Sequence, residues 1–258
     1  MEVFHFDRLT VQRYPDREAM GRAAGEYAVS ALRKLLEQKD RVNVLFPAAP
    51  SQDEVLSHLM RSDLDFSRIV ALHMDEYIGL APDAPQTFGH YLREHAFGLR
   101  PFAQVYYIAS EGTVSHQVAR YREILARHPL DLALIGLGEN GHIAFNDPAV
   151  ADFNDPETVK VVNLDGVCRM QQVHDGCFPS LDDVPRQAIT VTIPAILAAP
   201  LLICTVPTAR KAWAVEQTAC APVSTACPGT ILRTHPNCLL LCDRESGGGL
   251  SEKRGKEA

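Results

Sequence analysis

The chain has 258 residues, of which 46% are apolar, and this is enough to fill the core of one large α/β domain or two small ones. Its net charge of −7 and the absence of a run of five Lys or Arg residues exclude an electrostatic footprint for nucleic acid or an anionic membrane. The first residues lack the segments of a secretory signal, and no uncharged apolar run reaches the roughly 18 residues that span a bilayer. We therefore expect a cytoplasmic protein.

The elements of the first half alternate between strands and helices. A helix is predicted from Asp16 to Asp40, where apolar residues recur at helical spacing, and a strand follows in "RVNVLF". Ser51 and Glu54 have the spacing of a capping box, which predicts a helix over "SQDEVLSHLMRS". Further on we expect a strand at "RIVALHM", a helix from about Thr87 to Phe97, a helix over residues 111–128 and a strand at "LDLALIGL".

The second half continues the pattern with apolar segments at "AITVTIPAILAA", "PLLICTV" and "NCLLLCD" and a helix from about Thr208. Nearly continuous apolar strands predict a mainly parallel sheet with helices on both faces, because a half-exposed sheet would alternate with a period of two. We expect one three-layer, Rossmann-like α/β domain over residues 1–245 and a flexible, glycine-rich tail over residues 246–258. The seven cysteines form no C-x-x-C pair, which indicates buried free thiols and neither disulfides nor a structural zinc site.

Ligands of open parallel sheets bind beyond the carboxyl ends of the strands, and four loops leave such ends: "FPAAPSQ", "HMDEY", "GLGENGH" and "TVPTARKA". The third has the G-x-G-x-x-G spacing of a nucleotide loop. However, "HIAFNDP" follows, and Pro148 prevents the helix that a dinucleotide site needs. The glycines Gly138 and Gly141 instead indicate a tight backbone around a histidine.

His142 lies between an amide, Asn140, and a carboxylate, Asp147. Such neighbours can hold an imidazole in one tautomer for proton transfer, although a histidine that only bonds a loop fits the spacing equally well. Asp75 and Glu76 are adjacent acids that can cap the following turn. Alternatively, one of the two is a partly buried carboxylate that acts as a base and abstracts a proton next to a carbonyl. Lys211 is either a solvated lysine or a cation that meets an anion at a helix start.

Taken together, these loops resemble the glucosamine-6-phosphate deaminase/isomerase family, whose fold is shared more distantly with 6-phosphogluconolactonases. The resemblance runs from about Val42 to Asp243 and is carried by "MDEYIGL" and "GLGENGHIAFNDP", with "VPRQAITVTIPAIL" and "THPNCLLLCDRES" in the expected order. It implies that Asp75 moves a proton between carbons 1 and 2 of an opened amino sugar. It further implies that His142 opens the ring of the sugar and that Asp147 orients the His142 side chain. No metal or organic cofactor is implied, and a homo-oligomer is an expectation.

The sequence departs from the family pattern in three places. Asn140 replaces an aspartate, so the histidine has one negative neighbour fewer. "AAPSQ" replaces a donor-rich phosphate loop, although Ser51 keeps a hydroxyl there. The phosphate arginine has no clear equivalent: Arg169 and His174 are the candidates, while Lys211 matches the family's phosphate lysine.

The sequence thus predicts an amino-sugar-phosphate deaminase/isomerase that converts an aldose amino sugar phosphate to a ketose phosphate and ammonia. We assign catalysis to Asp75, His142, Asp147 and Asn140, and substrate binding to Ser51, Glu76, Gly138, Gly141, Arg169, His174 and Lys211. The alternatives are a sugar-phosphate lactonase on the same fold and a non-catalytic sugar-phosphate sensor.

Overall fold

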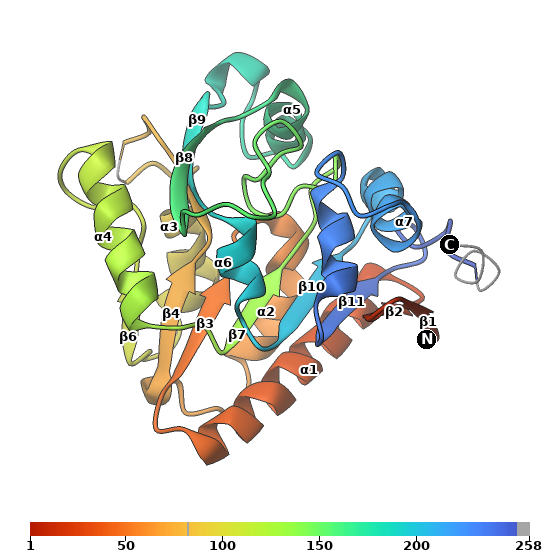
Figure 1. The fold of residues 1–258 in the computed structure, drawn as a ribbon. Helices are drawn as coiled ribbons and strands as arrows, with labels where there is room; N and C mark the ends of the chain where they lie inside the picture. Colours follow the sequence, from red (N-terminus) through yellow and green to blue (C-terminus); the bar gives the residue numbers. More distant parts are fainter. Residues whose placement is uncertain (82, 252–258) are drawn as a thin grey trace.

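A computed structural model describes residues 1–81 and 83–251. It places eight strands in one sheet with the order β1-β2-β11-β10-β7-β3-β4-β6, in which only β1 and β2 are antiparallel neighbours (Figure 1). Strands β4 and β10 are buried along their whole length, as their apolar sequences predict. The strands of this sheet are β1 (Glu2–Phe6), β2 (Leu9–Arg13), β3 (Val42–Phe46), β4 (Ile69–His73), β6 (Gln104–Tyr106), β7 (Leu132–Ile135), β10 (Leu202–Val206) and β11 (Cys238–Cys242).

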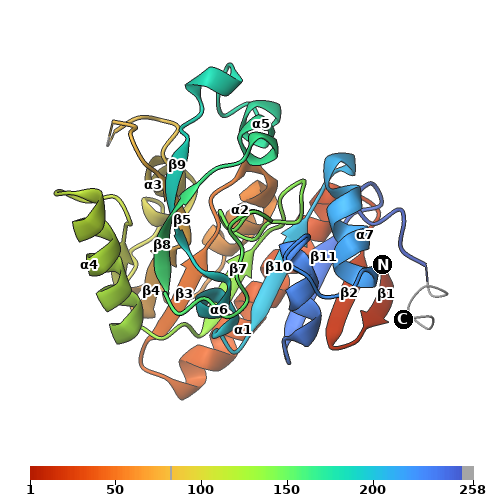
Figure 2. The same cartoon turned by 45° about the horizontal axis from the view of Figure 1, so that its top comes forward.

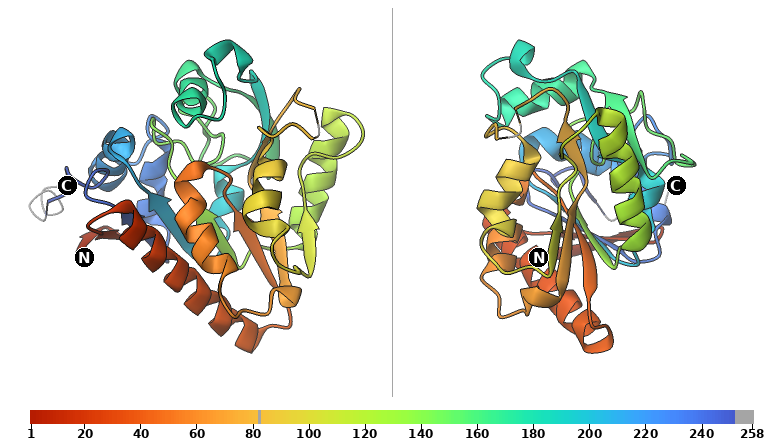
Figure 3. Two further views of the ribbon diagram at one scale, coloured as in Figure 1. Left: turned by 180° about the vertical axis from the view of Figure 1, so that it is seen from behind. Right: turned by 90° about the vertical axis from the view of Figure 1, so that its left-hand side faces the viewer.

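Helices cover both faces of this sheet, which confirms the predicted three-layer architecture (Figure 3). One core cluster packs against α1 (Arg17–Gln38), α2 (Asp53–Met60), α3 (Phe88–Leu92) and α5 (Gly166–His174). The other packs against α4 (Val114–Arg127), α6 (Ile193–Leu197), α7 (Ala212–Cys220) and the 3-10 turn η6 (Pro228–Thr234). Among the described residues, no helix has both the length and the apolar character that a bilayer crossing requires.

Most predicted helices form with small shifts at their ends. Asp16 caps α1 by accepting a hydrogen bond from the Ala19 amide, and Thr87 caps α3, which continues as a π-helical turn, η3 (Arg93–Phe97). The predicted capping box at Ser51 is wrong: Ser51 lies inside the 3-10 turn η1 (Pro50–Gln52), and Glu54 pairs with Arg17 instead. The turn begins at Pro50, one residue before the predicted start of the helix at Ser51, because the fixed φ of proline suits the first position of a helical turn.

A second sheet of three antiparallel strands stands beyond the carboxyl ends of the first, and the sequence patterns did not predict it (Figure 2). Its order is β5-β9-β8, and Asp75 of β5 lies opposite Thr190 of β9. This pairing holds the "MDEY" and "AITVT" segments together above the main sheet. The strands are β5 (Asp75–Tyr77), β8 (Val159–Asn163) and β9 (Gln187–Val191).

The segment after the predicted domain boundary at residue 245 continues to pack on the protein. Ser246 and Leu250 are buried, and the Ser246 hydroxyl donates a hydrogen bond to the carbonyl of Val206. Residues 252–258, the rest of the predicted tail, lie outside the described residues. The remaining short 3-10 turns are η2 (Phe66–Arg68), η4 (Leu181–Asp183) and η5 (Ala209–Lys211).

Candidate active site

The carboxyl ends of four adjacent strands, β10, β7, β3 and β4, open onto one cavity, as the four predicted loops require. Its wall includes Ser51 after β3, Asp75 after β4, His142 after β7 and Lys211 after β10. Residues that are far apart in the chain therefore meet at one edge of the sheet. The loop that carries His142 rises between α5 and α7 (Figures 1 and 2).

The three glycines of the loop after β7 allow close approaches that a larger residue would block. A Cβ atom at Gly138 would lie 2.1 to 2.3 Å from three atoms of the His142 ring. Gly141 has a φ of +80°, which favours glycine, and a Cβ there would meet the Sγ of Cys227 at 2.4 Å. A Cβ at Gly136 would meet the Gln52 amide nitrogen at 2.8 Å. The spacing thus serves backbone packing around an imidazole, and Gly136 and Gly138 line the cavity, whereas the predicted binding residue Gly141 is not on its wall.

The His142 imidazole is fixed through one of its nitrogens. Its Nδ1 lies 2.8 Å from the Asn140 Oδ1 and 2.9 Å from the Asp147 Oδ1. The Asn140 side chain also accepts a hydrogen bond from the His142 backbone amide and donates one to Asp147 at 3.0 Å. Because both neighbours of Nδ1 are oxygen acceptors, Nδ1 carries the proton, and Nε2 is left available to a ligand. Asn140 and Asp147 thus orient the ring from behind the cavity wall.

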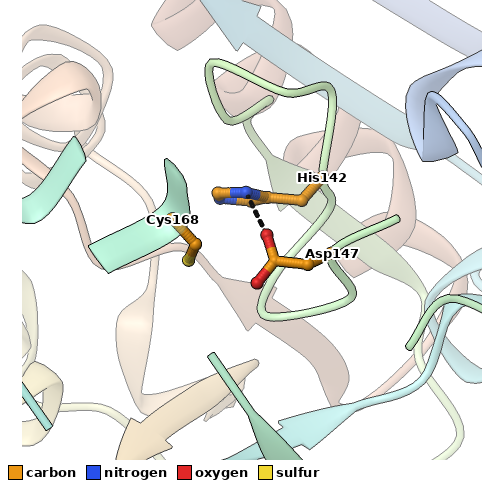
Figure 4. A group of neighbouring side chains, drawn as sticks. All are labelled: His142, Asp147 and Cys168. Carbon is orange, nitrogen blue, oxygen red and sulfur yellow. Dashed lines mark ion pairs between the residues drawn. The ribbon is translucent and has the colours of Figure 1, made fainter. Parts of the chain in front are cut away.

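Asp147 is buried and ionised in this arrangement. Figure 4 shows its carboxylate paired with the His142 ring, with Cys168 beside it. Burial raises its pKa, but the hydrogen bonds from His142, Asn140 and the Cys168 thiol outweigh burial, and the pKa lies below its ordinary value. Burial together with the Asp147 charge raises the pKa of the Cys168 thiol well above its usual range. Cys168 therefore stays protonated and acts as a donor to the carboxylate.

The same three groups are the only cluster with metal-ligating spacing among the described residues, because a His142 nitrogen, an Asp147 oxygen and the Cys168 sulfur lie within 4.8 Å of one another. A metal ion there would need the Cys168 thiolate and would compete for the Asp147 carboxylate that His142 uses. The raised pKa of the thiol opposes that exchange, so the donor set suits a hydrogen-bonded network better than a cation.

The two adjacent acids of the "MDEY" motif have separate environments. Asp75 lines the cavity, and burial together with the charge of Glu76 raises its pKa well above its ordinary value. The Glu76 carboxylate instead accepts hydrogen bonds from the backbone amides of Tyr77, Phe88 and Gly89 at 2.8 to 3.0 Å. Glu76 thus caps α3 and faces a neighbouring cavity. Only the first acid of the motif meets His142 at the shared wall.

Lys211 is 4% exposed and lines the cavity from η5. Burial lowers its pKa, and the charges of Asp175 and Glu139 act in the opposite direction. Thr208, which precedes the η5 turn, has a φ of +79°, and its amide donates a hydrogen bond to Asp243. The local backbone is held in a strained conformation, a feature common at ligand sites.

The two candidates for the phosphate arginine lie elsewhere. The Arg169 guanidinium donates hydrogen bonds to the carbonyls of Leu181 and Val184, so it ties α5 to η4. The His174 Nδ1 lies 3.1 Å from a Glu139 carboxylate oxygen. Neither side chain is on the cavity wall, and the structure therefore brings together Ser51, Asp75, His142, Gly138 and Lys211 without them.

Sequence reasoning missed three side chains of α5 that reach this site, Cys168, Gln171 and Gln172. Cys168 contacts Asp147, and Gln172 lines the cavity one helical turn later. Both belong to the buried face of α5, together with Gln171. Adjacent glutamines on the buried face of a helix are uncommon, because a buried amide needs partners, and this was the signal in the sequence.

The fold and the site define a class: an α/β protein with a carboxylate, an oriented imidazole and a buried ammonium on one cavity at the strand ends. Comparison with known proteins then identifies the group within that class. The chain belongs to the family of glucosamine-6-phosphate isomerases and 6-phosphogluconolactonases, whose family model matches residues 15–240.

Its relatives and structural neighbours agree with this membership. The chain is 31% identical over 221 residues to a glucosamine-6-phosphate deaminase of Lactobacillus delbrueckii, covering 85% of this chain and 92% of the relative. It is 34% identical over 207 residues to one of Listeria monocytogenes, covering 80% and 86%. A solved structure of a monomeric glucosamine-6-phosphate deaminase aligns with a TM-score of 0.83 at 24% identity, covering 92% of this chain and 98% of the other. A 6-phosphogluconolactonase from Thermotoga maritima aligns with a TM-score of 0.74 at 19% identity, covering 91% and 99%.

Proposed function

We propose that the protein is an enzyme that converts an aldose amino sugar phosphate, similar to glucosamine-6-phosphate, to a ketose phosphate and ammonia. The observation that carries this proposal is that Asp75 and His142, from loops far apart in the chain, line one cavity. The relatives that are named glucosamine-6-phosphate deaminases, at 31% and 34% identity, support the same reaction.

His142 is assigned ring opening. Its Nδ1 proton is held by Asn140 and Asp147, so Nε2 can take a proton from the sugar's hydroxyl at carbon 1 and return one to the ring oxygen. The Asp147 carboxylate stabilises the imidazolium that forms in between. Asn140 and Asp147 act through His142, and Asp147 is wholly buried.

Asp75 is assigned the proton shuttle. Its carboxylate takes the proton from carbon 2 of the opened sugar and delivers it to carbon 1. The oxygen on carbon 1 gains a proton and the amine loses one, which leaves a ketose imine at carbon 2. Water then adds to the imine carbon, and ammonia leaves. A general base works best when its pKa lies near the working pH, and burial raises the pKa of Asp75 in that direction. The steps balance without a metal or an organic cofactor.

The anionic end of the sugar is assigned to Lys211, with the Ser51 hydroxyl as a second donor from the first turn after β3. The expected homo-oligomer stays a prediction, and light scattering of the purified protein would test it. A lactonase on the same fold is the competing activity. It needs a base and a cation but no carboxylate that moves a carbon-bound proton, and the buried Asp75 on the cavity favours the deaminase.

The test is an incubation of the purified protein with 2-amino-sugar phosphates, unphosphorylated amino sugars and 6-phosphogluconolactone, followed by assays for ketose, ammonia and lactone hydrolysis. Equal amounts of ketose and ammonia are expected. Asp75→Asn should lower turnover by roughly 10²-fold or more while substrate binding changes little. Lactone hydrolysis without ammonia would replace the proposal by a lactonase, and binding without turnover would replace it by a sensor.

A further inference from the structure

Two buried polar side chains on the cavity wall lack a protein partner. Lys211 is 4% exposed and Gln172 is 7% exposed, and within residues 1–81 and 83–251 neither side chain has a hydrogen bond or an ion pair. Neither side chain has a polar atom that is both closed off from solvent and without a partner, so the Lys211 ammonium and the Gln172 amide face the open cavity, where a ligand can complete them. Together they suit a ligand group that accepts hydrogen bonds and carries negative charge.

The cationic charge available to that group is small. Lys211 is the single lysine or arginine among the described residues that line the cavity. Arg169 lies three residues before Gln172 on α5, and its guanidinium donates hydrogen bonds to the carbonyls of Leu181 and Val184. The acids Asp175 and Glu139 lie close enough to act on the Lys211 ammonium. The ligand therefore meets one positive charge, which these two acidic side chains already balance in part.

A phosphate monoester carries about −1.5 to −2 charges near pH 7, whereas a sulfate ester or a carboxylate carries one. One ammonium and one neutral amide balance the single charge of a sulfate ester or a carboxylate. A phosphate dianion would keep about one negative charge uncompensated in a cavity that Asp75 also lines, and this is unfavourable. An arginine at position 172 would supply the missing charge as a bidentate fork, which the amide of Gln172 does not.

On the basis of the proposed amino-sugar chemistry, we propose that Gln172 and Lys211 select the sugar's distal group, the one opposite the reacting carbons. In this assignment the enzyme accepts 2-amino sugars with a singly charged distal group at least as well as their phosphate esters. Gln172 donates a neutral hydrogen bond and Lys211 supplies the one charge. Gln172 is thus a specificity-determining residue that lowers the preference for a dianion.

The experiment compares kcat/KM for glucosamine-6-phosphate, glucosamine-6-sulfate, 2-amino-2-deoxyglucuronate and glucosamine. Gln172→Arg adds one charge at the site, and Gln172→Glu removes one with an almost unchanged shape. Met170→Arg is the matched control, because it adds a charge to α5 at a side chain that is 37% exposed. The folding of each variant is checked by its thermal midpoint.

For the wild type we expect kcat/KM with the sulfate ester to equal or exceed that with the phosphate ester. Gln172→Arg should raise the phosphate-to-sulfate ratio by roughly 10-fold or more, and Gln172→Glu should lower kcat/KM for both anions by roughly 10-fold. Met170→Arg should leave the phosphate-to-sulfate ratio unchanged, because its added charge lies at an exposed position.

A wild-type preference of about 10²-fold for phosphate over sulfate would overturn the inference, as would equal ratios in Gln172→Arg and Met170→Arg. If none of the sugars yields ketose or ammonia, the proposed function fails, and the thermal shift caused by inorganic sulfate and phosphate then tests the inference by itself. In that case a larger phosphate shift in Gln172→Arg than in the wild type supports the selection, and identical shifts reject it.

Discussion

Gly138→Ala is the sharpest test of how the loop after β7 positions the imidazole of His142. The added Cβ would lie 2.1 Å from the Cε1 of His142, which is 1.3 Å short of the 3.4 Å of an ordinary contact. The ring cannot simply retreat, because its Nδ1 is held at 2.8 Å from Asn140 and 2.9 Å from Asp147. Either the ring leaves these partners or the loop backbone moves.

A displacement of about 1 Å at a reacting group costs roughly 10²-fold in rate, so we expect kcat/KM of Gly138→Ala to fall by about that factor. The assay is steady-state formation of ketose from an accepted amino sugar, with circular dichroism and a thermal melt to show that the fold persists. Gly166→Ala is the control, because a Cβ there has no neighbour within 4 Å. It should leave the rate unchanged and stabilise the start of α5 slightly.

A folded Gly138→Ala protein whose kcat/KM lies within about threefold of the wild type would contradict this role of Gly138. Such a result would mean that the loop accommodates a methyl group without moving the imidazole. It would also mean that the close approach of Gly138 to His142 has no role in positioning the ring.

The remaining predictions concern the ionisable groups of the cavity. Asp75 has a folded pKa above the ordinary 3.8, so its ionisation destabilises the fold at pH 7 but not below pH 3.8. Asp75→Asn should therefore raise the thermal midpoint only at the higher pH, by about 2–4 °C for each kcal/mol of stability gained. Asp147 has a folded pKa below 3.8, so its ionised form stabilises the fold fully at pH 7, and this stabilisation is lost as the pH falls through the folded pKa. Asp147→Asn should lower the thermal midpoint at pH 7, and the difference from the wild type should shrink below pH 3.8. Equal midpoint changes in the two variants at pH 7 would contradict both assignments. Lys211→Met should remove the midpoint increase that inorganic phosphate or sulfate gives the wild type, and a retained increase would place the anion elsewhere.

The sequence by itself determined the layers of the fold and the edge at which the site forms. Runs such as "RIVALHM" and "PLLICTV" are apolar throughout, and this pattern occurs where a parallel sheet is covered on both sides. Because parallel strands share one carboxyl edge, the loops that carry Asp75, His142 and Lys211 had to meet there. The resemblance of these loops to a known family supplied the roles that their spacing left open.

Tertiary structure alone decided which polar side chains face the cavity. Hydrophobic periodicity predicts that α5 buries one face, but the rotation and placement of the helix put Gln172 on the wall and turned Arg169 to the carbonyls of η4. The second sheet likewise depends on pairing between β5 and β9, which are more than a hundred residues apart in the chain. Burial is encoded locally through the period of the sequence, whereas the partner that each buried group meets is set by long-range packing.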